Sequence, residues 1–405
     1  MNKLLTIKNY KIEDLNLFLI ALIPIALLAG SLLSNSIIIL IGILFLLDLL
    51  VRKNNYLLKD NNFYFLIIIY LYIVLNSFFI SENPESPLKA IGLLRFIILA
   101  YAISFYFKKF EKKIIKIWSV IFIIVSIDIL IEYFFGKNSL GFSSQYETRI
   151  ASFTGDELKI GGFYFGFIFI CLSFFQKKKI QFYSLMIIFF LIALMIGERS
   201  NFIKIFIMYL FFIVFFWKYS WPKKILLMIT VVLVTSFIVV NNMSLFNKYF
   251  NQIFEKTKNI ETNNDSNIFS LPIKFKELRH FAHYDFAIEM FKKNKLVGSG
   301  FKDFRIESYS SSDPDKIYSH GSTHPHQTHF EILAELGLIG YFLIILNIIL
   351  IIIKNIRDKE STFITKSGIL FLIATFMPIL PSGSFFTSYV ATIFWINYSF
   401  LIRKQ

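Results

Sequence analysis

The sequence predicts an all-α polytopic membrane protein of about twelve transmembrane helices, with both termini in the cytoplasm and one large periplasmic loop. Three observations predict this class. The chain of 405 residues is 56% apolar and 17% charged, its mean hydropathy is +0.62, and apolar runs near the length of a membrane span recur along it. No soluble domain of this size can cover so much apolar surface, so lipid is the expected solvent for most of the chain.

A helix that crosses about 30 Å of hydrocarbon needs about 20 apolar residues. Runs near that length predict nine helices in residues 1–241, a large loop at 242–330, and three helices with a short cytoplasmic tail in 331–405. Several runs are short for a span, so eleven or thirteen crossings are also compatible with the pattern. The predicted spans are 15–33, 36–51, 63–80, 88–107, 114–135, 160–175, 180–196, 201–217, 225–241, 331–353, 367–380 and 385–402.

Lysine and arginine set the orientation of these spans. Basic residues cluster in alternate short segments, such as 52–59, 108–116 and 177–179, and the short loops between them are nearly free of basic residues. Cytoplasmic loops carry such an excess, so the sequence predicts a bacterial inner-membrane protein with a periplasmic 242–330 loop. The net charge of +15 has the same origin, and no nucleic-acid partner is expected.

Two external segments are too polar for lipid. Residues 136–160 form the first, and the 242–330 loop is the second. A loop of this length in a compact protein is usually functional or disordered. Within it, the asparagine-rich stretch 259–267 indicates flexibility, whereas the helical spacing from Phe275 to Phe291 predicts a helix packed at the membrane interface.

Histidine is confined to the long loop, and the run His324-Pro-His326-Gln-Thr-His329 contains three of the six. Three interpretations compete. In the first, the run binds a metal, although its spacing is not a standard zinc pattern. In the second, the histidines are polar surface residues without a role. In the third, one of them is a general base, because neutral imidazole takes up a proton near pH 7. The six histidines are His280, His283, His320, His324, His326 and His329.

Arginine is found at or beyond the predicted outer membrane face, where it binds phosphate bidentately and stays charged when partly desolvated. The turn Gly197-Glu198-Arg199-Ser200 is so short that Arg199 must lie near the apolar phase, which indicates a functional residue. An interfacial anchor or an ion pair with Glu198 is the alternative. These arginines are Arg95, Arg149, Arg199, Arg279 and Arg305.

Two of the arginines have further partners in the sequence pattern. Arg95 lies deeper than Arg199 and has Asp156 or Glu157 as alternative ion-pair partners. Arg279 and His283, four residues apart, share one face of the predicted loop helix.

The run His326-Gln327, nine residues, then Gly337-Leu-Ile-Gly340 resembles the H[NSQ]-x9-G-x-x-G signature of the O-antigen ligases and related O-antigen polymerases. The Arg199 turn also resembles a segment of this family, as does Arg279 upstream of Gly298-Ser-Gly300. Two positions depart from the usual pattern: Gln327 replaces the commoner asparagine, and Glu198 replaces a small residue. The segment from Arg149 to Glu157, which contains Phe153-Thr-Gly-Asp-Glu157, resembles a variant more familiar in polymerase-like members.

This resemblance implies a GT-C-type O-antigen ligase fold and a metal-independent inverting glycosyltransferase that needs no cofactor. The implied partners are a glycan donor on undecaprenyl diphosphate, a lipid A-core or glycan acceptor, and membrane lipids. It also implies His326 as the base and Arg199 and Arg279 as the groups that hold the diphosphate. Arg149, Arg95, His324 and Glu157 are further candidates, and Gly337 and Gly340 are expected to serve close helix packing.

Other functions remain open at this stage. A polymerase differs from a ligase only in its acceptor, and ligation is favoured because the signature is intact. A secondary transporter also has many spans, but carriers usually show two similar halves and ionisable residues at the membrane midplane. A membrane protein that binds lipid-linked glycans without catalysis is the last alternative.

Overall fold

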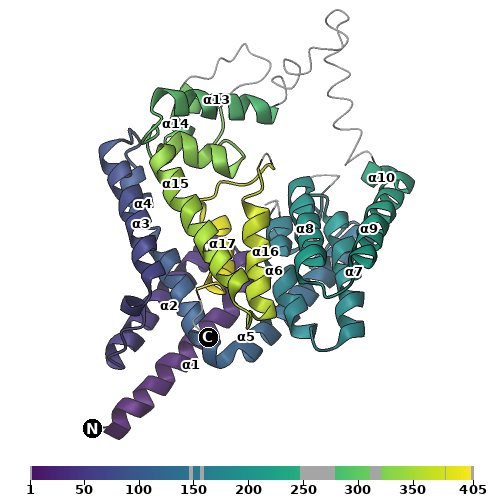
Figure 1. Ribbon diagram of the computed structural model, residues 1–405, viewed down its shortest axis with the longest axis horizontal. Helices are drawn as coiled ribbons and strands as arrows, with labels where there is room; N and C mark the ends of the chain where they lie inside the picture. Colours follow the sequence, from purple (N-terminus) through teal and green to yellow (C-terminus); the bar gives the residue numbers. More distant parts are fainter. Residues whose placement is uncertain are drawn as a thin grey trace, which may run out of the picture.

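The computed structural model describes residues 2–145, 149–155, 159–246, 279–310, 321–378 and 380–402, and at 2–11, 243–244 and 279–281 it describes the backbone alone. These residues fold into helices, with no strand among them (Figure 1). Eight of the helices are long and apolar enough to cross a membrane, and two shorter apolar helices accompany them. The chain is therefore an all-helical polytopic membrane protein, and the number of twelve crossings stays a prediction.

Every predicted span overlaps a helix, and spans 88–107 and 114–135 both fall in one helical run. The helices that precede the long loop are α1 (Asn2–Ala29), α2 (Ser31–Val51), α3 (Asn61–Phe79), α4 (Ser86–Ile91), α5 (Leu94–Phe135), α6 (Ile160–Phe175), α7 (Lys179–Ile196), α8 (Arg199–Phe211), α9 (Trp221–Asn241) and α10 (Met243–Phe246). The helices that follow are α13 (Arg279–Lys293), α14 (Phe304–Ser310), α15 (Thr328–Arg357), α16 (Phe363–Thr375) and α17 (Ser388–Ser399).

The long helix α5 is broken at Phe110, where φ is −119° and ψ is 16°. The rings of Phe107 and Trp118 lie 5.5 Å apart. Eleven residues of straight helix would separate them by about 16 Å along the axis. The chain therefore bends sharply at Phe110, and the predicted connection at 108–116 is a tight turn within a helical run.

Several predicted cytoplasmic segments meet at one end of the bundle, called the inner end here. The Glu13 carboxylate pairs with Arg52 at 2.9 Å and with Lys109 at 2.7 Å. The ring of Phe400, at the end of α17, lies 5.2 Å from that of Phe107. The start of α1, the end of α2, the α5 break and the end of α17 therefore share one end, as the charge pattern predicts.

The predicted external segments meet at the opposite end, called the outer end. Ile150 donates its amide to the Ile196 carbonyl at 3.1 Å, and the Asp303 carboxylate accepts the amide of Glu82 at 2.9 Å. Helices α13 and α14 of the long loop lie above α15 at this end in Figure 1. At the same end, the Ser86 hydroxyl donates to the Phe301 carbonyl, and the Ser382 amide donates to the His326 carbonyl.

Helix α15 is broken near its outer end by Gly337, whose φ of 64° and ψ of −167° are not helical. A break leaves carbonyls before it and amides after it without helical partners. The segment 294–300 supplies them. The carbonyls of Ala334 and Glu335 accept the amides of Ser299 and Gly300 at 2.9 and 3.1 Å, and the amides of Leu338 and Ile339 donate to the carbonyls of Lys295 and Leu296 at 2.9 and 3.1 Å.

The glycines permit this approach. A Cβ on Gly298 would lie 2.5 Å from the Glu335 carbonyl oxygen, and a Cβ on Gly337 would lie 2.5 Å from the Gly298 amide nitrogen. A Cβ on Gly340 would lie 2.9 Å from the Tyr72 ring of α3. The expectation that Gly337 and Gly340 serve close packing is therefore confirmed, and the α15 backbone and the 294–300 segment lock together.

The loop helix α13 packs on α15 through a small apolar cluster of Phe286, Ala287, Met290, Phe304 and Ala334. Its observed bounds, Arg279–Lys293, extend two residues beyond the predicted end at Phe291. Positions 275–278 of the predicted helix lie outside the described residues, as does the 259–267 stretch. The loop helix is thus held by the same helix that carries the histidine signature.

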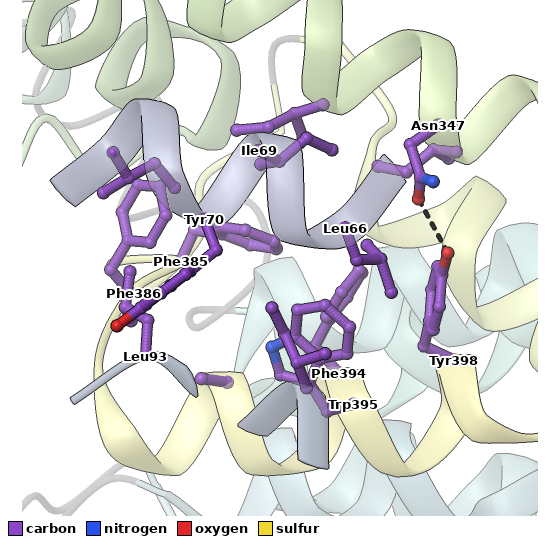
Figure 2. A pocket seen from close by; sticks show the side chains of 15 residues that line it. Leu66, Ile69, Tyr70, Leu93, Asn347, Phe385, Phe386, Phe394, Trp395 and Tyr398 are labelled. Carbon is purple, nitrogen blue, oxygen red and sulfur yellow. Dashed lines mark hydrogen bonds between the residues drawn. The ribbon is translucent and has the colours of Figure 1, made fainter. Parts of the chain in front are cut away.

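An apolar pocket of about 60 Å³ lies among α3, α5, α15 and α17 (Figure 2). Figure 2 shows phenylalanine and leucine side chains around it, and a hydrogen bond of 2.7 Å from the Tyr398 hydroxyl to Asn347 at one edge. This pocket is too small and too apolar to hold a charged head group, so the polar site must lie elsewhere.

We predict that Gly337→Ala lowers the free energy of unfolding by about 1–3 kcal/mol or more, because the substitution adds backbone strain to a collision with the 296–298 backbone. Gly136→Ala is the matched control: φ is +72°, and no atom lies within 4 Å of the added Cβ. Thermal unfolding in detergent compares the two. A Gly337 variant as stable as the Gly136 variant would contradict the proposed locking of α15.

Candidate functional site

The signature begins at the outer end of α15, where Gln327 is the N-cap. Its Oε1 accepts the amide of Phe330 at 2.9 Å, and its side chain is buried. An N-cap residue satisfies an amide that has no partner within the helix. The second position of the signature therefore fixes the start of α15, and so fixes the place of the preceding His326.

His326 lies just before this cap with a φ of +59°, a conformation that non-glycine residues rarely adopt. Its carbonyl accepts the amide of Ser382 at 2.7 Å, which ties it to the segment between α16 and α17. Strained backbone of this kind is found at functional sites because the surrounding structure must hold it. The position of His326 is thus fixed by contacts on both sides.

The hydrogen bonds of Ser322 indicate the protonation of the His326 ring. The Ser322 hydroxyl donates to the His324 carbonyl at 2.9 Å, and it lies 3.2 Å from His326 Nε2. A hydroxyl has one hydrogen, so with that hydrogen on the His324 carbonyl it accepts from Nε2. In this arrangement the neutral ring carries its proton on Nε2.

Two further histidines surround this ring. The His324 ring centroid lies 4.1 Å from that of His326, and that of His283, on α13, lies 5.4 Å away. The His283 side chain is buried. Burial lowers the pKa of His324, Glu331 opposes this effect, and Lys302 adds to it. Neutral imidazole is therefore favoured at His324 near pH 7.

His329 has a different role. Its Nε2 lies 2.9 Å from the Phe376 carbonyl, which can only accept, and its Nδ1 lies 3.0 Å from the Tyr341 hydroxyl. Both nitrogens are thereby engaged, and the residue links α15 to the end of α16. Tyr341 is twelve residues further along α15, so this contact requires the break at Gly337.

A buried carboxylate beside the histidines holds the segment 381–388. Glu331, 1% exposed, accepts the Phe385 amide at 2.7 Å and the Ser384 hydroxyl at 2.5 Å. Lys302 lies 3.3 Å from the same carboxylate and donates to Ser384 at 2.9 Å. Glu331 therefore supports the segment whose Ser382 holds the His326 carbonyl.

A cavity of about 460 Å³ adjoins this segment, between α6, α8, α16 and α17. It differs from the pocket of Figure 2 because lysine residues line it. Ser382 lines it and also binds the His326 backbone. Its polar lining residues include Lys159, Asn201, Lys204, Thr328, Ser382 and Ser388.

Arg95 reaches the wall of this cavity. Its Nη2 donates to the Ser388 hydroxyl at 3.1 Å, and its Nη1 donates to the Gly92 carbonyl at 2.9 Å. The two ion-pair partners predicted for Arg95, Asp156 and Glu157, lie outside the described residues. The structure therefore also says nothing of Glu157 as a candidate site residue. The structure thus connects Arg95 to the cavity through one hydroxyl.

Arg199 is the first residue of α8, two positions before Asn201 in the cavity wall. The Glu198 carboxylate accepts the Gly161 amide at 3.0 Å and the Asn201 side chain at 2.6 Å. Burial raises the pKa of Glu198, and the positive charge of Arg149 opposes this effect. Glu198, which replaces a small residue of the family pattern, therefore links the start of α8 to the start of α6. Arg149 and Arg199 lie nearby.

Arg279 is the first described residue of α13 and lies one turn before His283. Nothing further of its side chain, or of that of His280, is described, and His320 lies outside the described residues. Within the described part of the chain, no group of three His, Cys, Asp or Glu side chains stands close enough to hold a metal ion.

The sequence reasoning missed two residues of this site. Lys204, on α8, is 6% exposed and lines the cavity. A lysine within a predicted span is a recognisable signal of function, so Lys204 could have been proposed as a site residue from the sequence. Glu331 gave no comparable signal, because the partners of its carboxylate lie about fifty residues away.

These features define a class: a polytopic membrane protein with an imidazole and cationic site at the outer end of its helices. A protein-family model described as O-antigen ligase matches residues 184–345. The match confirms the resemblance to the O-antigen ligase family, and it covers Arg199, the loop helix and the whole signature. This family implies a membrane glycosyltransferase of the ligase or polymerase type, acting on a lipid-linked glycan and an acceptor. No curated protein matches the chain.

We predict that the protein loses stability as pH falls below about 6.5, in part through His324. The lowered pKa means that the folded state binds fewer protons than the unfolded state between that pKa and the ordinary value of 6.5. Stability therefore rises with pH through this window and levels off above it. His324→Gln should flatten this slope in thermal unfolding measured across pH. An unchanged slope in this variant would contradict the assignment.

Proposed function

We propose that the protein is an inverting glycosyltransferase that moves a glycan from undecaprenyl diphosphate to a sugar hydroxyl at the periplasmic membrane face. Ligation of O-antigen to lipid A-core is the favoured reaction. The observation that carries the proposal is the bond from the Ser382 amide to the His326 carbonyl, because Ser382 also lines the cation-bearing cavity. A base and a site for an anion therefore adjoin.

The reaction needs two groups. A base removes the proton of the acceptor hydroxyl as its oxygen attacks the anomeric carbon from the face opposite the diphosphate. The bond from that carbon to the phosphate oxygen breaks, and its electron pair leaves with the lipid diphosphate. Cations stabilise the charge that develops on this leaving group. The anomeric configuration is thereby inverted, without a metal or a nucleotide sugar.

His326 is the proposed base. The contact from Nε2 to Ser322 fixes the ring orientation, and the neighbouring His283 and His324 rings limit its movement. His324 is the second candidate, since its lowered pKa also favours a neutral ring. A neutral imidazole in a fixed orientation is what proton removal near pH 7 requires.

Arg199 and Arg279 are the proposed primary contacts of the diphosphate, and Arg149 and Arg95 are secondary. Support comes from the place of Arg199 at the start of α8 beside the cavity wall, and from the bond of Arg95 to Ser388. A helix N-terminus adds favourable electrostatics for an anion. The proposal for Arg279 rests on its place one turn before His283.

A repeat-unit polymerase is the second candidate, suggested by the likeness of residues 153–157 to polymerase-like members. The two reactions share donor and chemistry and differ in the acceptor. A deletion strain separates them: long unattached polymer accumulates if the protein is a ligase, and single-repeat glycan accumulates if it is a polymerase. If neither product accumulates in the deletion strain, both assignments are contradicted.

We predict that His326→Ala lowers transfer by about 10²- to 10⁴-fold, the usual contribution of a general base. The measurement uses purified protein, lipid-diphosphate glycan and acceptor, in a buffer with a chelator. His329→Gln is the control, because both nitrogens of His329 are engaged in packing. It should lower stability and spare turnover per folded molecule. Turnover by His326→Ala at the wild-type rate would remove this residue from the mechanism.

A further inference from the structure

Lys204 is a buried cation in a membrane helix. It lies five residues after Arg199 on α8, about 7 Å further along the helix axis toward the inner end. Its side chain is 6% exposed and lines the 460 Å³ cavity. A cation buried at this depth is costly and is a functional candidate when it faces a cavity.

The protein groups around Lys204 leave its ammonium group incompletely satisfied. Among the described residues, its Nζ lies 5.7 Å from the centre of the Phe165 ring and is within the field of the Glu198 carboxylate. No hydrogen bond or ion pair to its three donors is found in that part of the chain. Each Glu198 oxygen accepts one hydrogen bond, from the Gly161 amide and from the Asn201 side chain. An anion in the cavity would accept hydrogen bonds from the Lys204 ammonium group.

The cavity has two kinds of wall. Hydroxyl and amide groups of Asn201, Ser382 and Ser388 line it, together with the Lys204 ammonium. The aromatic rings of Phe165 and Phe371 line it as well. Such a cavity fits a ligand with an anionic head group and an apolar chain.

We propose that Lys204 binds a phosphate of a prenyl diphosphate lipid whose head group occupies this cavity. This inference rests on the proposed function and deepens it: it adds a cation that neither the histidine signature nor the arginine segments include. Asn201 and Ser388 provide hydrogen bonds to the same head group, and the first prenyl unit lies against Phe371. No bond is made or broken by Lys204, which contributes binding.

Binding without turnover tests this role. The full chain is placed in phosphatidylcholine nanodiscs without acceptor, and the affinity for undecaprenyl diphosphate is measured. Lys204→Met should weaken it by about 10- to 100-fold, as expected for a hydrogen-bonded charge, and Lys204→Arg should retain most of it. Lys366→Met is the matched control, because Lys366 also lies over a phenylalanine ring, 5.5 Å from that of Phe216, and lines a cavity at the inner end.

Competition identifies the ligand class. Inorganic pyrophosphate and phosphatidylglycerol should displace the lipid diphosphate poorly, because the first lacks the chain and the second has a single phosphate. Equal displacement by either would overturn the assignment, and so would unchanged affinity in Lys204→Met. If that variant does not fold, Val390→Trp fills the cavity with the charge in place, and unchanged affinity there would overturn the proposal. The affinity is measured without acceptor, so it does not depend on whether the protein catalyses glycan transfer.

Discussion

The break in α15 at Gly337 is the constraint on which the outer end depends. It exposes two carbonyls and two amides inside a membrane protein, where water is not available to satisfy them. The segment 294–300 pairs with all four, and this pairing fixes the loop helix α13 above α15. The break also turns the first part of α15 so that His329 reaches Tyr341. His326 lies just before that part and is positioned with it.

Buried carboxylates hold the remaining outer segments. Glu132 accepts the amides of Ala151 and Ser152, at 3.1 and 2.5 Å, beside Arg149, and Glu331 accepts that of Phe385. Association of helices in lipid lacks the hydrophobic driving force that operates in water. Charge-assisted hydrogen bonds to backbone amides are strong and directional. They can therefore fix the outer segments that carry arginine and histidine.

The apolar helices and the segments that share each end were predictable from apolar length and basic loops, whereas the number of crossings and the sidedness stay predictions. His326 and Arg199 were proposed from residue type and spacing; the structure places Arg199 at the start of α8 and His326 in contact with Ser382, and their roles stay predictions. The cap role of Gln327 and the clamp of Glu331 were not predictable, because each depends on a backbone amide whose position only the fold defines. Lys204 was visible as a lysine inside a span, but its cavity is lined by residues of helices far apart in sequence.

The central claim is that the signature histidines lie at the periplasmic face, and sidedness tests it most directly. Cys171 is the single cysteine of the sequence. A membrane-impermeant maleimide is applied to intact spheroplasts that carry single introduced cysteines in a Cys171→Ser background. Thr323→Cys, exposed beside His324, should be labelled at once, and Glu360→Cys, exposed beyond the inner end of α15, only after lysis. Labelling of Glu360→Cys in intact spheroplasts, with Thr323→Cys protected, would contradict the account.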